Sequence, residues 1–165
     1  MTKEERELLI QDICERLLYG VKFESYDKIP IVEYSVCNKV FIHEQGYVII
    51  ELLDKGFDGN ALASTSINLT TVSRLPKPYL RPMSSMTEDE LNECVQQSGI
   101  RDVECPDWHS LPKEKHFEAR LKHSINMFLA DSRTIRWLNE HHFDHRGLIE
   151  KGLAVEAKEG MYDQI

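Results

Sequence analysis

The sequence predicts an α+β fold: an N-terminal helix, a small antiparallel sheet and then a group of helices. Two observations carry this prediction. From residue 21 to 72 apolar and polar residues alternate, as in strands, whereas after residue 87 the apolar residues recur at helical spacing. Between these parts, Arg74 to Thr87 contains three prolines. Each proline fixes its own φ and keeps the residue before it out of the α region, so we expect an extended joint there.

The N-terminal segment has the pattern of an amphipathic helix. Thr2 and Glu5 have the spacing of a capping box, in which each side chain accepts a hydrogen bond from the backbone amide of the other residue. An apolar residue then recurs every four positions, at Leu9, Ile13 and Leu17. Because an isolated helix of this length is marginal in water, we expect it to cover the sheet.

The alternating part of the chain predicts four or five strands. We expect strands to begin at Val21 and Ile29, with a break at Asn38, a hairpin from Val40 to Leu53 and a last strand from Ile67 to Val72. Short turns without intervening helices imply antiparallel pairing. The strands therefore form either a small antiparallel sheet or an SH3-like barrel.

Three or four helices are predicted after the joint. Thr87 and Glu90 have the spacing of a second capping box. A longer helix is expected to open near Ser110, and another, after Asp131, carries Trp137 at the margin of its apolar face.

The joint itself is too apolar for a free linker, and we expect Leu80 and Met83 to be buried. We divide the chain into a helix and β unit (1–75), a joint packed on the sheet (76–87) and a helical part (88–165). We expect these parts to dock as one compact domain.

The composition is that of a globular protein, with 41% hydrophobic and 29% charged residues. No apolar run approaches the roughly 20 residues of a membrane helix, and the acidic N-terminus lacks the apolar segment of a secretory signal. We therefore expect a cytoplasmic protein that binds no membrane. The net charge of -8 disfavours non-specific binding to nucleic acids.

A resemblance to a known group of proteins rests on both ends of the chain and the joint. The segments that carry it are Thr2–Leu17 with Tyr19-Gly20-Val21, Pro78–Thr87 (PYLRPMSSMT), Trp137–Ala154 (WLNEHHFDHRGLIEKGLA) and Glu159–Tyr162 (EGMY). They resemble an uncharacterised family of small proteins from phages, prophages and other mobile elements of gut anaerobic bacteria. The resemblance implies a genomic setting and transfers no activity, cofactor or catalytic residue.

One candidate site is a cluster of histidines near the C-terminal end of a predicted helix. If that helix continues, His141 and His145 lie on one face at the spacing of helical two-histidine metal sites. Asp144 or another carboxylate would then complete the ligands of a zinc ion. The alternative is capping and packing, because Gly147 ends the segment and the helix dipole favours histidines near a C-terminus.

A second candidate is a locally basic stretch, 113–136, with a formal charge of +3 in a negatively charged chain. It is either a surface for a nucleic acid or an acidic partner, or a solvated helix face. The side chains proposed for binding are Lys113, His116, Arg120, His123, Arg133 and Arg136.

The sequence contains none of the glycine-rich nucleotide-binding motifs and no hydrolase nucleophile motif, so we predict no cofactor and no catalytic residue. We expect a non-catalytic protein-interaction module encoded by a mobile element, which acts on an unknown host or phage protein. The alternatives are a nucleic-acid-binding module that uses the basic helix 113–136, and a metal-dependent hydrolase centred on the His141–His145 cluster.

Overall fold

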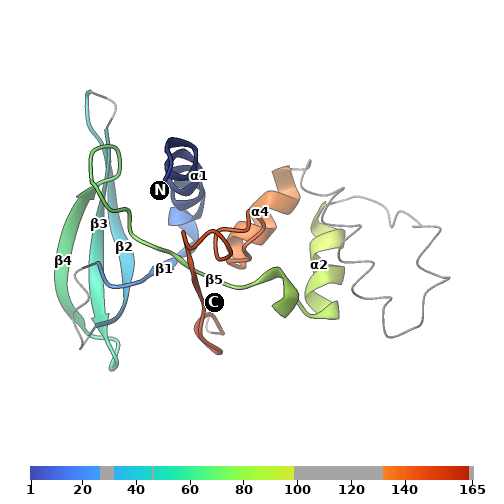
Figure 1. Cartoon of the computed structure of the whole chain (residues 1–165). Coiled ribbons are helices and arrows are strands. Elements are labelled where there is room, and N and C mark those ends of the chain that lie inside the picture. The colour runs from blue at the N-terminus through green and yellow to red at the C-terminus, as the bar shows by residue number, and fades with distance from the viewer. Residues whose placement is uncertain (27–31, 46, 99–131, 164–165) are drawn as a thin grey trace.

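A computed structural model describes residues 1–26, 32–45, 47–98 and 132–163 and confirms the α+β fold (Figure 1). In chain order its elements are α1 (Lys3–Arg16), a 3-10 turn (Leu17–Tyr19), β1 (Lys22–Phe23), β2 (Val32–Ile42), β3 (Val48–Gly56), β4 (Ala61–Asn68), β5 (Tyr79–Leu80), a second 3-10 turn (Met83–Ser85), α2 (Glu88–Ser98), α4 (Ser132–Glu140) and β6 (Val155–Glu156).

The main sheet is open and antiparallel, with strand order β1-β2-β3-β4. Of the two predicted alternatives, the SH3-like barrel is wrong, because β1 and β4 lie at opposite edges of the sheet and do not pair. β1 is two residues long, and its Phe23 forms an antiparallel bridge with Pro78 of the joint. The joint therefore lies beside β1. In a closed barrel, β4 would have to pair with β1 at this position.

Two strand boundaries differ from the prediction. β2 continues through Asn38, where the pairing with β3 only shifts its register. The last strand ends at Asn68, whose side chain accepts hydrogen bonds from the amides of Thr70 and Thr71 and so forms a turn. The strand instead extends back to Ala61, because pairing with β3 outweighs the weak local β propensity of alanine and serine.

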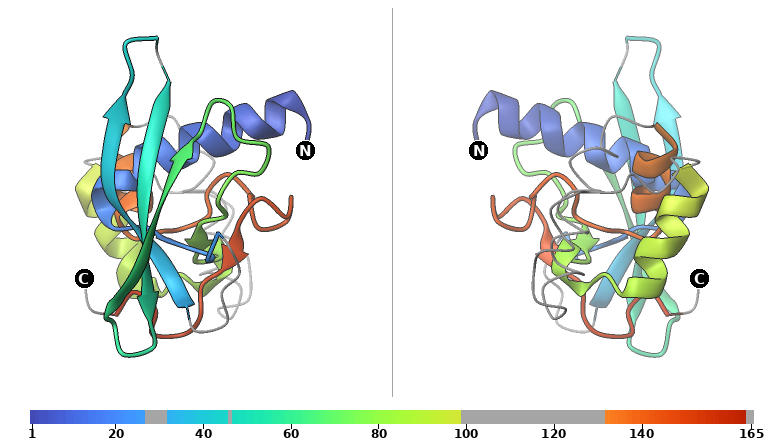
Figure 2. Two further views of the ribbon diagram at one scale, coloured as in Figure 1. Left: turned by 90° about the vertical axis from the view of Figure 1, so that its left-hand side faces the viewer. Right: turned by 90° about the vertical axis from the view of Figure 1, so that its right-hand side faces the viewer.

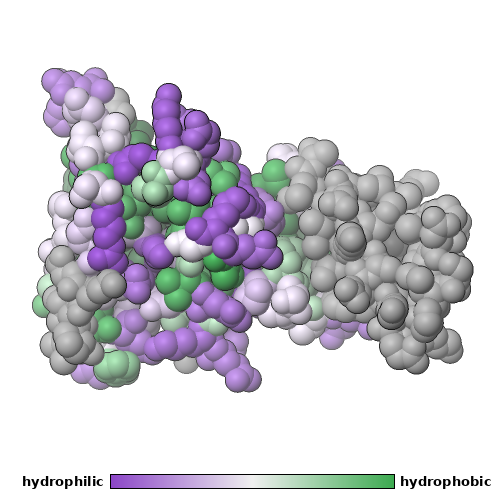
Figure 3. Space-filling view, viewed as in Figure 1, coloured by the Kyte–Doolittle hydropathy of each residue, from purple (hydrophilic) through white to green (hydrophobic). Residues whose placement is uncertain are grey.

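Helix α1 covers one face of the sheet (Figures 1 and 2). The Thr2 and Glu5 capping box forms as predicted. Leu9 and Ile13 are buried against sheet residues such as Leu52. Leu75, just before the joint, belongs to the same core, and the joint and the C-terminal segment add Leu80, Leu148 and Leu153 to it. On the face seen in Figure 3, apolar residues gather over these two segments and polar residues surround them.

The joint is packed as expected, and Leu80 is fully buried. Its β5 pairs in parallel with β6, so that Tyr79 lies opposite Val155. Met83 is only partly buried and contacts a second core. The division of the chain at residues 75 and 87 remains a prediction.

The second core lies between α2 and α4 and contains Met86, Leu91, Cys94, Val95, Trp137, Leu138 and Phe143. Trp137 is thus buried, and its predicted place at the helix margin is wrong. The helix expected to open near Ser110 lies outside the described residues. Within the ranges that are described, no helix is long and apolar enough to cross a membrane.

The capping box of α2 provides a first test of this arrangement. The amide of Glu90 donates to Thr87 Oγ1 at 3.2 Å, and the amide of Thr87 donates to Glu90 Oε2 at 2.8 Å. Thr87→Ala is expected to lower the free energy of unfolding by about 1 kcal/mol in urea, because an amide of the first turn loses its acceptor. Thr87→Ser keeps the hydroxyl and is expected to lose much less. Equal losses in the two variants would contradict a role for the hydroxyl.

Candidate functional site

The histidine cluster does not form the helical face that the metal hypothesis needs. α4 ends at Glu140, so the condition for this hypothesis is not met, and His141 and His145 do not share a helical face. His141 Nδ1 donates to the carbonyl of Trp137 at 2.9 Å, and its ring stacks on the indole. The Asp144 carboxylate accepts hydrogen bonds of 2.8 Å from two backbone amides, those of Leu148 and Ile149.

His145 has a structural partner as well. Its Nε2 lies 3.0 Å from Asn139 Oδ1, to which it donates. Burial, and then the nearby Arg16 and Arg146, lower the pKa of His145 to about 3. In the part of the chain that the structure describes, no three histidine, cysteine or acidic side chains are grouped to hold a metal ion.

A buried ionic network lies beside this cluster and joins α1 to the C-terminal segment. Asp12 and Arg16 are both fully buried and pair at 2.8 Å. Arg146 approaches Asp12 at 3.4 Å and Glu15 at 2.7 Å. Arg16 Nη2 also donates to the carbonyl of Phe143 at 2.8 Å. These contacts fix the segment after α4 against α1 and pair the buried charges, although Arg16 Nη1 has no hydrogen-bond partner among the described residues.

The basic surface is described only in part. Lys113, His116, Arg120 and His123 lie outside the described residues. Arg133 and Arg136 belong to α4 and are exposed, and Arg136 Nε donates to Glu140 Oε1 at 3.0 Å. Binding of a nucleic acid or an acidic partner by this stretch therefore stays a prediction.

A different surface is prominent in the structure, namely the free edge of β4. Among the described strands, β4 has β3 as its one neighbour. Its residues Ala61–Ser64 and Ser66 are exposed, and the strand ALASTSIN contains no charged residue and no proline. Natural sheets usually protect an exposed edge with charges, proline or a covering segment. β4 carries neither a charge nor a proline.

The register shows which backbone groups this edge presents. The amide of Leu69 donates to the carbonyl of Val48, so alternate residues of β4, including Ile67 and Thr65, point their amides and carbonyls toward β3. Ser64 and Ser66 lie opposite Leu53 and Glu51 in the intervening pairs. Their backbone N–H and C=O groups therefore face away from the sheet.

Apolar side chains adjoin this edge on the face of the sheet opposite α1. Leu62 and Phe41 are each 46% exposed, and Ile49 and Leu53 are half-buried. The register and the alternation of side chains place Phe41, Ile49 and Leu53 on this face. Leu62 is the extra residue of the β-bulge between Ala61 and Ala63, and its exposed side chain lies at the edge itself. We call β4 together with these residues the open-edge surface.

Sequence reasoning missed this surface because residues 61–66 have no hydrophobic alternation. The signal that was present is the lack of any charge or proline in the eight residues of β4, next to a predicted hairpin. Comparisons with protein-family models, curated proteins and solved structures gave no match for this chain.

Proposed function

We propose that the protein is a non-catalytic interaction module that binds an extended segment of another protein along β4. The observation that carries this proposal is the exposed, uncharged edge of β4, where the backbone groups of Ser64 and Ser66 face away from β3 and have no strand beside them among the described residues. Addition of a strand to such an edge gives affinity through the main chain, and alternate side chains give specificity.

The surroundings of β4 favour a particular kind of segment. On the face opposite α1, its alternate side chains would lie beside Ser64 and Ser66 of β4, with Leu53 of β3 one strand further in. The exposed Leu62 lies at the same edge, so small or apolar residues fit there. A chain of net charge -8 repels a second copy of itself, which favours a neutral or basic segment of a different protein. In the mobile-element setting that the resemblance implies, that protein is a host or phage protein.

Two substitutions test the edge directly. Ser64→Pro removes an edge-facing N–H and leaves the pairing with β3 intact, since proline is tolerated on edge strands at such positions. Leu62→Lys places a charge on the apolar part of the open-edge surface. Leu18→Lys is the matched control, because Leu18 is 88% exposed and follows α1, away from β4.

The four tagged proteins are expressed at native level in the natural host, purified, and the retained proteins quantified by mass spectrometry. Wild type and Leu18→Lys are expected to retain one stoichiometric partner protein. Ser64→Pro and Leu62→Lys are expected to retain at least tenfold less of this protein. Urea unfolding checks that all variants stay within about 1 kcal/mol of wild type.

Two results contradict the proposal. Equal retention of the partner by all four proteins would exclude β4 as the binding surface. The absence of any stoichiometric partner would exclude an interaction module. Light scattering resolves the remaining possibility: a wild-type dimer that Ser64→Pro dissociates would show that a second copy occupies the edge.

A further inference from the structure

A second open edge belongs to the C-terminal half of β2, on the side of the sheet away from β4. β1 pairs with β2 at Ser35 and Val36, and from Lys39 onward β3 is the one described strand beside β2. Residues 39–43, which we call the β2 edge, are all exposed. Figure 2 shows that the β2–β3 hairpin extends past α1, so the described elements leave this edge uncovered.

Three consecutive apolar side chains form the centre of the β2 edge. Val40 and Phe41 are each 46% exposed, and Ile42 is 81% exposed. Valine, phenylalanine and isoleucine favour strands. The run from residue 38 to 43 (NKVFIH) contains no carboxylate in a chain of net charge -8, and Lys39 lies outside the apolar centre. An exposed apolar edge of this kind is a template for pairing with another chain.

The register shows which backbone groups the β2 edge presents. The amide of His43 donates to the carbonyl of Tyr47 at 2.9 Å, so these two residues form a hydrogen-bonded pair. Such pairs alternate along antiparallel strands, and Val40 and Ile42 therefore belong to the intervening pairs. The carbonyl of Val48, which lies opposite Ile42, accepts a hydrogen bond from the segment after β4 and so points away from β2. The N–H and C=O groups of Val40 and Ile42 thus face away from the sheet.

These groups complement a second copy of themselves. When two copies of β2 run antiparallel with Phe41 opposite its own counterpart, Val40 of each copy lies opposite Ile42 of the other. Each such pair can exchange two hydrogen bonds, because both residues present their backbone groups outward. The two Phe41 residues form a pair without hydrogen bonds, in which side chains approach most closely and the rings can pack. A two-fold axis through this pair closes the contact.

The charges near the β2 edge permit this arrangement. In the same register Lys39 lies opposite His43 of the second copy, and residues 39–43 contain no carboxylate that could face another one. The net charge of -8 on each copy acts against association over longer distances, and salt screens this repulsion. The match of Val40 with Ile42 about a two-fold axis is a property of two identical segments. It favours a second copy over an unrelated segment as the occupant.

We propose that two copies of the chain associate through the β2 edge, as a two-fold symmetric dimer in which the two sheets become continuous. The edge of β4 stays free in each copy, so the dimer carries two equivalent surfaces for strand addition. The dimer itself rests on β2 and does not depend on that function. Because only residues 39–43 of each copy pair, the interface is small, and we expect a Kd on the order of 100 µM.

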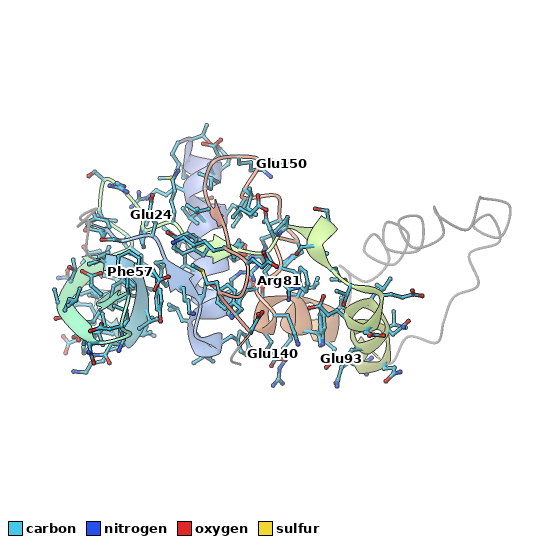
Figure 4. The ribbon with its side chains drawn as sticks, turned by 90° about the horizontal axis from the view of Figure 1, so that it is seen from below. Glu24, Phe57, Arg81, Glu93, Glu140 and Glu150 are labelled. Carbon is cyan, nitrogen blue, oxygen red and sulfur yellow. The ribbon has the colours of Figure 1, made fainter. Side chains whose placement is uncertain are left out.

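Sedimentation equilibrium of the full chain, at concentrations from about 10 µM to about 1 mM, measures this Kd. Ile42→Pro removes an N–H that faces outward and leaves the pairing with β3 intact, so it is expected to raise the Kd at least tenfold. Phe57→Lys is the matched control and should keep the wild-type Kd. Phe57 is 72% exposed and lies in the β3–β4 turn, at the other end of the sheet (Figure 4).

Substitutions at Phe41 test the two-fold axis itself. Phe41→Lys and Phe41→Glu each place like charges opposite one another across the axis, so each variant alone is expected to dimerise at least tenfold more weakly than wild type. An equimolar mixture of the two variants places opposite charges there and is expected to recover dimers. This recovery is specific to a contact in which residue 41 meets its own counterpart.

The proposal is wrong if the wild type stays monomeric at about 1 mM, if Ile42→Pro and Phe57→Lys have the same Kd, or if the Phe41 mixture forms no more dimer than either variant alone. A dimer that Ser64→Pro dissociates would place the second copy on β4 and would likewise overturn it. If a Phe41 variant fails to fold, the comparison of Ile42→Pro with Phe57→Lys still decides. Failure of this dimer leaves partner binding by β4 untouched, because Ser64→Pro and Leu62→Lys measure that binding separately.

Discussion

Arg16→Met is expected to lower the free energy of unfolding by roughly 3–5 kcal/mol, the cost of leaving a buried charge without its partner. Arg16 is fully buried in α1, and its Nε donates to the equally buried Asp12 at 2.8 Å. Without the guanidinium, the Asp12 carboxylate keeps one cation, Arg146, at the longer distance of 3.4 Å. The carbonyl of Phe143 also loses its hydrogen bond.

Urea unfolding followed by circular dichroism measures this loss. Lys3→Met is the matched control, because Lys3 and Glu7 form a pair of the same spacing in the same helix, 3.7 Å apart but largely exposed. That variant is expected to stay within about 0.5 kcal/mol of wild type. The double variant Asp12→Asn/Arg16→Met should lose less than the sum of its single variants, since it leaves no unpaired buried charge. Equal stabilities of Arg16→Met and Lys3→Met would refute the importance of this pair.

Arg16 also illustrates which features a sequence can predict. The capping boxes at Thr2 and Thr87 formed as expected because each depends on residues three positions apart. The burial of Arg16 depends on Phe143, which lies 127 positions away. In the sequence, Arg16 cannot be told apart from an ordinary exposed basic residue in the last turn of a helix, where the helix dipole favours a positive charge.

The same distinction holds for the strands and the candidate sites. β4 begins at Ala61 because β3 pairs with it, and no local pattern in residues 61–66 indicates a strand. The histidine cluster was found from its residue types, but its function was inferred from a helix that ends at Glu140. The positive φ of His142 belongs to the end of α4, where its amide donates to the carbonyl of Asn139 and the amide of Phe143 donates to the carbonyl of Leu138. Its burial against Tyr162 depends on a residue 20 positions away, and no local pattern indicates it.

Acidification is expected to remove about 4 kcal/mol of stability between pH 7 and pH 5. Burial and neighbouring cations lower the pKa of His142 and of His145 to about 3 each, whereas the unfolded chain has histidine pKa values near 6.5. Because the folded pKa is the lower one, the unfolded state binds protons first. The stability that the two neutral histidines contribute is therefore complete above about pH 6.5 and is lost as the pH falls toward 3. By pH 5 the loss is about 2 kcal/mol for each histidine.

Urea titrations at several values between pH 7 and pH 5 measure this slope, and two variants assign it. His142→Asn suits the left-handed backbone, and His145→Gln can still donate to Asn139. Each single variant should lose about half of the pH dependence of stability. The double variant should lose nearly all of the part that these two histidines cause. His43→Asn, at an exposed position in the β2–β3 turn, should keep the wild-type slope. A double variant with the full wild-type slope would show that other groups cause the acid sensitivity, and that these two imidazoles are not held neutral by the fold.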